Sequence, residues 1–291
     1  FDIDPGAAGG FLLPVLGRPI GKVILDEEFD IAEAAVPQPD GSVRTENVLR
    51  YFDHVFPLAK GTEELPLVEL LEAQHYRLAS WRVANDELNY RRFFDVETLA
   101  AVRIEELPVF EQTHATLMRL QDEGVIDGYR IDHPDGLADP REYLRRLEGA
   151  TGGAWTVIEK ILEGEESLPE DFPVAGTTGY DALWRVQGIF HDPVGATELT
   201  RLWHAFTADT RSFESITRES AKEVISGSLW AEITRLVDLA QRICDADIML
   251  RDTTERQLQH AIIQLLMAMD RYRAYIVPGE KAPAREREVL A

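Results

Sequence analysis

Two acidic residues, each at the end of a short apolar run, could together break and remake a glycosidic bond. Asp132 ends the run Gly128–Asp132 and Glu159 ends Trp155–Glu159, with one predicted helix between them. Two carboxyl groups on neighbouring strand ends can lie about 5–5.5 Å apart, the separation at which retaining glycosidases use a nucleophile and a general acid/base. An accidental pair is the alternative, because the chain holds 52 Asp and Glu residues.

Arg130 is expected to act on Asp132. Side chains alternate along a strand, so Arg130 and Asp132 share one face and Ile131 lies on the other. A guanidinium group favours the charged form of a neighbouring carboxylate, which is the form that a nucleophile needs. An Arg–Asp ion pair that only braces the strand end fits the same spacing, and both interpretations stay open at this point.

The elements that must position these residues alternate between helix and strand. Gly124 follows a stretch of helical spacing and predicts its end, and Asp139-Pro140 is a typical helix start. Strands that alternate with helices predict βαβ units in a parallel sheet. The expected order is a helix over Val109–Glu123, a strand over Val125–Asp132, a helix over Arg141–Leu147 and a strand over Ala154–Ile158.

The regions on either side have a different character. Residues 1 to about 65 are rich in Gly and Pro and predict strands and loops, with a turn at Pro37–Gly41. After Tyr180 the apolar residues repeat at helical spacing. The other expected elements are strands at Gly21–Leu25 and Asn47–Phe56, a helix over Pro66–His75 and a strand over Arg77–Val83. Two helical stripes are expected to face a core: Leu229, Ile233, Leu236, Ala240 and Ile243, then Leu258, Ile262, Leu265 and Met269.

Longer strings around the two acids resemble a known enzyme family. Gly-Tyr-Arg-Ile-Asp-His at Gly128–His133 is similar to the second conserved region of the α-amylase superfamily, and the strand that ends at Glu159 is similar to the third. The strings over 85–94, 127–140, 159–163 and 174–183 resemble the maltooligosyltrehalose synthase family. The resemblance runs from about Leu13 to about Tyr275.

The resemblance implies an intramolecular transglycosylation, in which the reducing-end α-1,4 bond of a maltooligosaccharide becomes an α,α-1,1 bond. Asp132 would be the nucleophile and Glu159 the general acid/base. Arg130 would orient the nucleophile, and His133 would bind sugar hydroxyl groups. Further substrate-binding candidates, for which structural roles are equally open, are Tyr90, Arg91, Arg92, Lys160 and Tyr180.

The resemblance also predicts the fold class: α/β, with the middle strands of a (β/α)8 TIM barrel. The expected parts are a β/loop subdomain at 1–65, the central part of the barrel at 66–194, a helical subdomain at 195–277 and a linker or frayed tail at 278–291. A third acid of the superfamily, after a His-Asp pair, is missing, since His191-Asp192 is interpreted as a helix-end loop. We therefore expect an incomplete barrel with low or no activity, whose strand edges pair with missing barrel segments or another chain.

Composition narrows the function classes. A net charge of −22 repels phosphate backbones, so nucleic acid is not expected as a partner. No long apolar run or basic leader is visible, and Cys244 stands alone, so we expect a cytoplasmic protein without membrane span, disulfide, metal site or cofactor. An α-amylase-type hydrolase, including one that releases trehalose, an inactive glucan-binding fragment and a helical interaction protein remain as alternatives.

Overall fold

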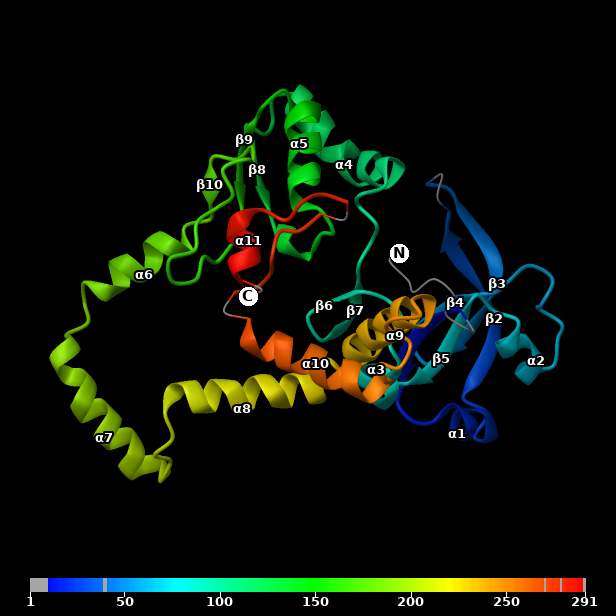
Figure 1. Ribbon diagram of the computed structural model, residues 1–291. Coiled ribbons are helices and arrows are strands. Elements are labelled where there is room, and N and C mark those ends of the chain that lie inside the picture. Colours follow the sequence, from blue (N-terminus) through cyan, green and yellow to red (C-terminus); the bar gives the residue numbers. More distant parts are fainter. Residues whose placement is uncertain (1–9, 39–40, 270, 278, 290–291) are drawn as a thin grey trace. The chain divides into compact units, whose positions relative to one another are not determined.

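The computed structural model describes residues 10–38, 41–269, 271–277 and 279–289, and Figure 1 shows its ribbon. The contacts divide the chain into two units. The first joins the described residues up to Ala101 with Ala221–Ile263, and the second joins Val102–Ser220 with the described residues from Gln264 onward. Each unit contains strands and helices, so the predicted mixed α/β class is confirmed.

The first unit contains an antiparallel sheet of order β2-β3-β4. Its strands are β2 (Phe29–Pro37), β3 (Val43–Tyr51) and β4 (His54–Pro57). The predicted strands in Asn47–Phe56 are confirmed. Pro37 pairs with Val43, as expected for a hairpin at Pro37–Gly41, although residues 39 and 40 lie outside the described residues.

A parallel strand pair, β1 (Phe11–Leu16) and β5 (Tyr76–Ser80), packs in the same unit with α1 (Ile20–Leu25) and α2 (Leu67–Glu72). The helix predicted within Pro66–His75 is confirmed. The strand predicted at Gly21–Leu25 is wrong, because Pro19 begins a helix there and only Val23 of that helix is buried. The apolar core that these elements share contains Leu16, Val23, Leu49, Leu70 and Leu78.

The strand expected over Arg77–Val83 is shorter than predicted, since it ends at Ser80 and a 3-10 turn, η1 (Trp81–Val83), follows. The remaining elements of this unit are α3 (Ala84–Glu87), β6 (Arg92–Phe93), β7 (Val96–Ala100) and α9 (Trp230–Ala246).

The stripe predicted on α9 is partly wrong. Ile233 is buried as expected, but Leu236 and Ile243 are 44% and 59% exposed. The helix has apolar residues on two adjacent faces, and packing against Leu88 and Tyr90 selects the face that carries Ala231. The buried residues of α9 are Ala231, Ile233, Val237 and Cys244.

The second unit contains a parallel sheet of order β10-β9-β8 with α4 and α5 packed against one face, as Figure 1 shows. The elements are α4 (Leu107–Asp122), β8 (Gly128–Ile131), α5 (Pro140–Thr151), β9 (Trp155–Ile158) and β10 (Gly176–Thr177). The predicted helix–strand alternation is confirmed. Gly124 has a φ of +70°, and the Asp139 side chain accepts a hydrogen bond from the Glu142 amide at 3.0 Å, as expected for a helix end and a helix start.

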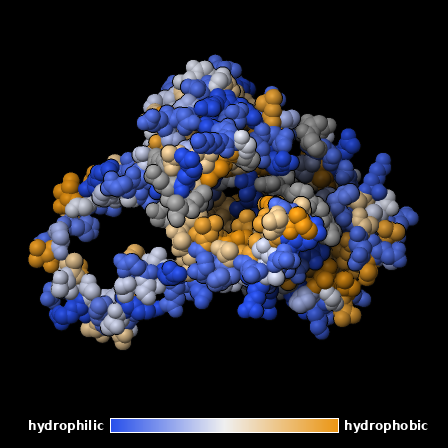
Figure 2. All heavy atoms as spheres, in the orientation of Figure 1, coloured by the Kyte–Doolittle hydropathy of each residue, from blue (hydrophilic) through white to orange (hydrophobic). Residues whose placement is uncertain are grey.

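The stretch after β10 is helical, as predicted. It forms α6 (Tyr180–Gly188), η3 (Pro193–Gly195), α7 (Ala196–Thr207), α8 (Phe213–Ser226) and α10 (Glu255–Ala268), and α11 (Ala284–Val289) follows. Apolar side chains are exposed along α6 and α7, the segments at the left of Figure 2. No helix among the described residues combines the length and the apolar run needed to cross a membrane.

Candidate functional site

The two predicted acids follow paired strands. In the register of β8 and β9, Ile131 lies opposite Ile158, and the Glu159 amide donates to the Ile131 carbonyl at 2.8 Å. Asp132 and Glu159 are the next residues of their strands. The prediction that both acids stand at neighbouring strand ends is confirmed.

Sheet alternation explains why both acids leave the core. Ile131 and Ile158 pack with Phe110, Tyr143 and Leu144 in the core of the second unit. The following residue of each strand therefore points to the opposite face. Both carboxyl groups therefore point to the same side of the sheet, away from this core.

The backbone after Asp132 connects it directly to Glu159. The His133 amide donates a hydrogen bond to Glu159 Oε2 at 2.8 Å. His133 has a φ of +45°, in the left-handed region that residues other than glycine seldom adopt. In this bend the amide donates to the Glu159 carboxyl group, so the turn after Asp132 is hydrogen-bonded to the residue that follows β9.

Arg130 forms the ion pair expected from the strand alternation. Its Nη1 lies 2.6 Å from Asp132 Oδ1, with the two side chains 53% and 62% exposed. Such an exposed pair contributes roughly 0.2–1 kcal/mol to stability, so its main effect is to orient the Asp132 carboxylate. An open hollow of about 460 Å³ borders Arg130 and Trp155, but neither Asp132 nor Glu159 lines it.

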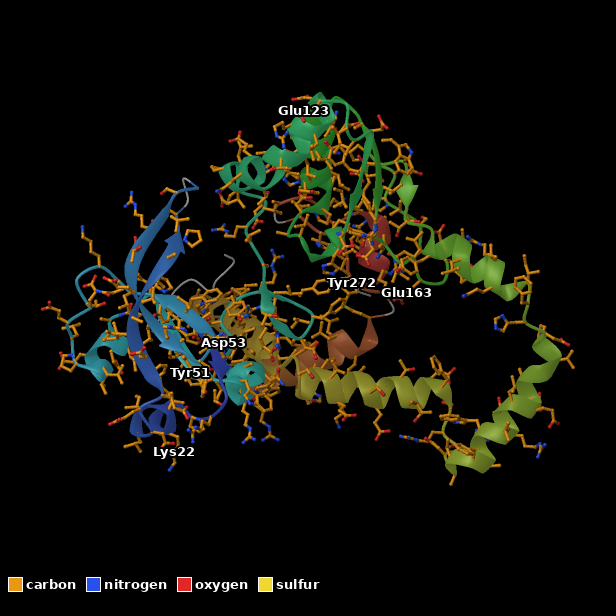
Figure 3. The ribbon with its side chains drawn as sticks, turned by 180° about the vertical axis from the view of Figure 1, so that it is seen from behind. Lys22, Tyr51, Asp53, Glu123, Glu163 and Tyr272 are labelled. Atoms are coloured by element: carbon orange, nitrogen blue, oxygen red, sulfur yellow. The ribbon has the colours of Figure 1, made fainter. Side chains whose placement is uncertain are left out.

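Tyr272 is a site residue that the sequence did not reveal. Its hydroxyl lies 2.8 Å from His133 Nε2, and it belongs to the segment after α10 that is labelled in Figure 3. Burial, together with the negative charges of Asp135 and Glu159, raises its pKa above the ordinary value. Tyr272 lies far from His133 in the sequence, so no local spacing signals the contact.

The turn that follows Asp132 also depends on Gly136. A Cβ atom at this position would lie 2.5 Å from His133 Nδ1. Because the His133 ring is held by Tyr272, it cannot move away without losing that hydrogen bond. Any side chain at residue 136 would therefore collide with the His133 ring. This steric constraint favours glycine at the end of η2 (Pro134–Gly136).

Lys160 is buried, although it follows Glu159 directly in the sequence. Its side chain is 2% exposed, and its Nζ is 3.0 Å from both Asp135 Oδ2 and Glu166 Oε1. The prediction that Lys160 binds substrate loses its basis, because strand alternation sends residue 160 to the side opposite Glu159.

Tyr90 and Arg92 occupy packed positions in the first unit. Tyr90 is 2% exposed and its ring stacks on Phe11 at 4.3 Å. The Arg92 side chain is fully buried, and its Nε donates to Glu232 Oε1 at 3.0 Å. These contacts favour the structural role that the sequence left open for both residues. Arg91 between them is half-buried.

Tyr180 and the His-Asp pair lie at the two ends of α6. Tyr180 is 42% exposed and begins the helix after Gly179, which has a φ of +93°. His191 and Asp192 follow the last turn, and Asp192 accepts a hydrogen bond from the Val194 amide at 3.0 Å. The interpretation of His191-Asp192 as a helix-end loop is confirmed.

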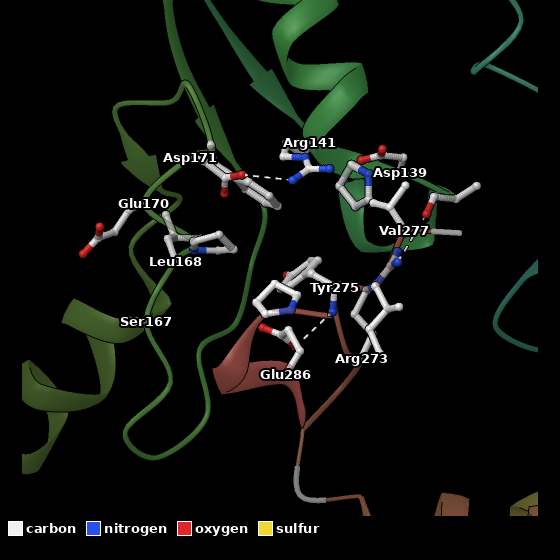
Figure 4. Close-up of a pocket in the computed structure, with 16 residues that line it drawn as sticks. Asp139, Arg141, Ser167, Leu168, Glu170, Asp171, Arg273, Tyr275, Val277 and Glu286 are labelled. Carbon is white, nitrogen blue, oxygen red and sulfur yellow. Dashed lines mark hydrogen bonds and ion pairs between the residues drawn. The ribbon is translucent and has the colours of Figure 1, made fainter. Parts of the chain in front are cut away.

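A cavity of about 470 Å³ lies elsewhere in the second unit. Figure 4 shows Arg141, Asp171, Tyr275 and Glu286 around it, with Arg141 Nη1 3.3 Å from Asp171 Oδ2. Neither Asp132 nor Glu159 lines this cavity. It is therefore separate from the site of the two acids.

Comparisons with known proteins agree on one kind of enzyme. No family model matches the sequence. A curated Mycobacterium tuberculosis protein, provisionally named a maltooligosyl trehalose synthase, is 35% identical over 284 residues, which make up 97% of this chain and 34% of that protein. The chain therefore spans about a third of the length of the curated relatives that it matches.

Solved structures give the same result. The structure of maltooligosyltrehalose synthase from Arthrobacter ramosus has a TM-score of 0.79 and 37% identity, over 95% of this chain and 33% of that one. A hypothetical maltooligosyl trehalose synthase of Sulfolobus tokodaii has a TM-score of 0.76 and 28% identity, over 100% of this chain and 35% of that one.

Proposed function

We infer that this chain is a segment of a maltooligosyltrehalose synthase, because its similarity to proteins of that name runs along nearly its whole length. The observation that carries the proposal is the in-register end of β8 and β9, where the amide of His133, the residue after Asp132, donates a hydrogen bond to Glu159. A maltooligosaccharide is the proposed substrate, and the proposed location is the cytoplasm.

The proposed reaction proceeds through two displacements. A carboxylate oxygen of Asp132 attacks the anomeric carbon of the penultimate glucose, and Glu159 donates a proton to the departing O4 of the terminal glucose. The freed glucose turns, Glu159 takes the proton of its anomeric hydroxyl, and that oxygen displaces Asp132. An α,α-1,1 bond replaces the α-1,4 bond, and no water is consumed.

Arg130 and His133 have supporting roles in this proposal. The 2.6 Å ion pair with Arg130 holds Asp132 in the orientation for attack. The His133 ring, which is bound to the Tyr272 hydroxyl, is proposed to hydrogen-bond to sugar hydroxyl groups. Tyr180 is proposed as a further ring near the substrate, while Tyr90, Arg91 and Arg92 are proposed to support the site through packing.

We propose that the parallel strands of the second unit, β8, β9 and β10, are part of a (β/α)8 barrel. β8, β9 and β10 pair in parallel, and α5 lies between β8 and β9 in the chain. In such barrels the reacting groups stand at the C-terminal ends of strands, where Asp132 and Glu159 are found. The remaining strands and the third acid are expected in the two thirds of the relatives that this chain does not cover.

The test uses maltopentaose and an assay of reducing ends. A protein that contains this segment within a complete barrel should lower the number of reducing ends, and Glu159→Gln should slow it about 10²–10⁴-fold. Asp132→Asn should abolish the reaction. Glu163→Gln, an exposed acid in the loop after Glu159, is the matched control and should behave as wild type.

Two outcomes would contradict the proposal. A rise in reducing ends would indicate a hydrolase of the same superfamily. Full activity of Asp132→Asn would exclude covalent chemistry at this site. The 291-residue chain alone is expected to be inactive, so trehalosyl formation by this chain would overturn the incomplete barrel.

A further inference from the structure

A buried charged cluster joins the segments that follow β8 and β9. We call Lys160, Asp135, Glu166 and Tyr275 the Lys160 cluster. Lys160 Nζ lies 3.0 Å from one oxygen of each acid, and the side chains of Lys160, Asp135 and Glu166 are 2%, 7% and 3% exposed. The Tyr275 hydroxyl donates to Asp135 Oδ1 at 2.6 Å. One buried cation thus faces two buried carboxylates.

The cluster is attached to the proposed catalytic acids through very short pieces of chain. Lys160 is the residue after Glu159, and Asp135 is the third residue after Asp132. Glu166 belongs to the loop that follows Lys160. Because Lys160 binds both acids of the cluster, it ties the turn after β8 to the loop after β9.

The segment after α10 encloses the turn from its other side. Arg273 Nη1 donates to the carbonyl oxygens of Asp135 at 2.8 Å and Leu137 at 2.5 Å. The Tyr275 amide donates to Glu286 Oε2 at 3.0 Å, a contact drawn as a dashed line in Figure 4. The backbone of the turn is therefore held by side chains that lie far away in the sequence.

The turn needs this support. His133 has a φ of +45°, and such a conformation costs of order 1–3 kcal/mol unless the surroundings impose it. In this conformation its amide donates to Glu159 at 2.8 Å. Desolvation of three charges makes the cluster a weak source of stability, since apolar residues of similar volume often stabilise a protein equally well. Stability alone is therefore a poor reason for its presence.

We propose that Lys160 is a positioning residue, whose buried ammonium group holds the turn after β8 and the loop after β9 so that the His133 amide binds the Glu159 carboxyl group. The catalytic meaning of this contact rests on the proposed function. The contact itself does not, since it can be measured without substrate.

The experiment follows hydrogen exchange of the His133 amide by NMR in the full chain. Lys160→Met removes the charge and keeps most of the volume. We expect exchange at His133 to accelerate about tenfold to a hundredfold, the loss expected for one hydrogen bond to a charged group. Leu144→Ala is the matched control, because Leu144 is buried in the same unit and lies outside the Lys160 cluster. It should accelerate all amides of the unit together, without a selective effect at His133.

A second variant distinguishes a positioning role of Lys160 from general destabilisation. It can also be used if Lys160→Met alone folds poorly. The triple variant Lys160→Met, Asp135→Asn, Glu166→Gln leaves no buried charge in the cluster. We expect it to keep the protection of core amides while His133 still exchanges faster than in wild type. A wild-type exchange rate at His133 in the triple variant would overturn the proposal. Failure of the glucan assay, with selective exchange at His133, would instead count against the proposed function alone.

Discussion

His114 is a buried residue of the second unit whose ring binds the protein through both nitrogens. Nδ1 lies 2.9 Å from the Phe110 carbonyl oxygen and Nε2 lies 2.9 Å from the Tyr143 hydroxyl. The carbonyl requires a proton on Nδ1, so the Tyr143 hydroxyl donates to a bare Nε2. Burial is the main cause that lowers the pKa of His114 below its ordinary value. Protonation in the folded state would turn Nε2 into a donor, so the Tyr143 hydroxyl would have to accept instead of donate, and a charge would be placed in a buried site.

We expect His114 to make the protein less stable in mild acid. Its folded pKa is lowered, so the unfolded chain binds the proton more readily, and the free energy of unfolding falls as the pH drops below about 6.5. Denaturant unfolding from about pH 8 to about pH 5 measures this fall. His114→Gln, which does not titrate, should show a shallower fall. The same pH dependence in both proteins would contradict the assignment.

At the scale of elements, Gly128 allows β8 and β9 to pair closely. A Cβ atom at Gly128 would lie 2.5 Å from the Trp155 carbonyl oxygen, which is backbone and cannot rotate away. The first residue pair of the two strands is Gly128 and Trp155. The strand ends that carry Asp132 and Glu159 therefore depend on a glycine at the opposite end of the ladder.

Gly128→Ala should push the two strands apart. We expect a loss of about 1–3 kcal/mol in the free energy of unfolding, as for other overpacked sites. Gly149→Ala is the matched control in α5, where a Cβ atom meets nothing within 4 Å. A helix interior favours alanine over glycine by roughly 0.5–1 kcal/mol, so this variant should gain stability. Denaturant unfolding measures the stability of both variants. An unchanged free energy of unfolding in Gly128→Ala would show that a Cβ atom fits between the two strands.

Local patterns predicted the elements where one signal dominates. Gly124 and Asp139-Pro140 marked real helix ends, and the strand ends at Asp132 and Glu159 were found because each strand is short and apolar. The apolar residues of α1 have no clear helical period, so they do not predict a helix. The only local sign of the helix is Pro19, which precedes its first residue.

Contacts between distant residues were out of reach of the sequence. Its position directly after Glu159 predicts that Lys160 lines a substrate cleft. In the structure Lys160 pairs with Asp135, and Asp135 in turn binds Tyr275, which lies more than a hundred residues further along the chain. The buried face of α9 was chosen by packing against Leu88 and Tyr90, which no period within the helix can reveal. Tyr272 was missed for the same reason.

The whole molecule is built from two units that each use separate parts of the chain. In the first unit, a buried ion pair connects β6 with α9. Arg92 donates to Glu232 through Nε at 3.0 Å and through Nη2 at 3.3 Å, and its side chain is fully buried. Folding of this unit therefore brings together residues that lie on either side of Val102–Ser220 in the sequence.

Glu232→Gln should destabilise the first unit selectively. Removing the carboxylate leaves the buried Arg92 charge with only the more distant Glu97, whose Oε1 lies 3.9 Å from Nη1, at a cost of roughly 3 kcal/mol. Hydrogen exchange should accelerate in β1, β5 and α9, while β8 and β9 keep their wild-type rates. Glu198→Gln is the matched control, because Glu198 pairs with Arg201 at 2.9 Å with both side chains more than 70% exposed. That variant should change stability by less than about 1 kcal/mol. Equal acceleration in β8 and β9 of the Glu232→Gln protein would mean that the two units unfold as one.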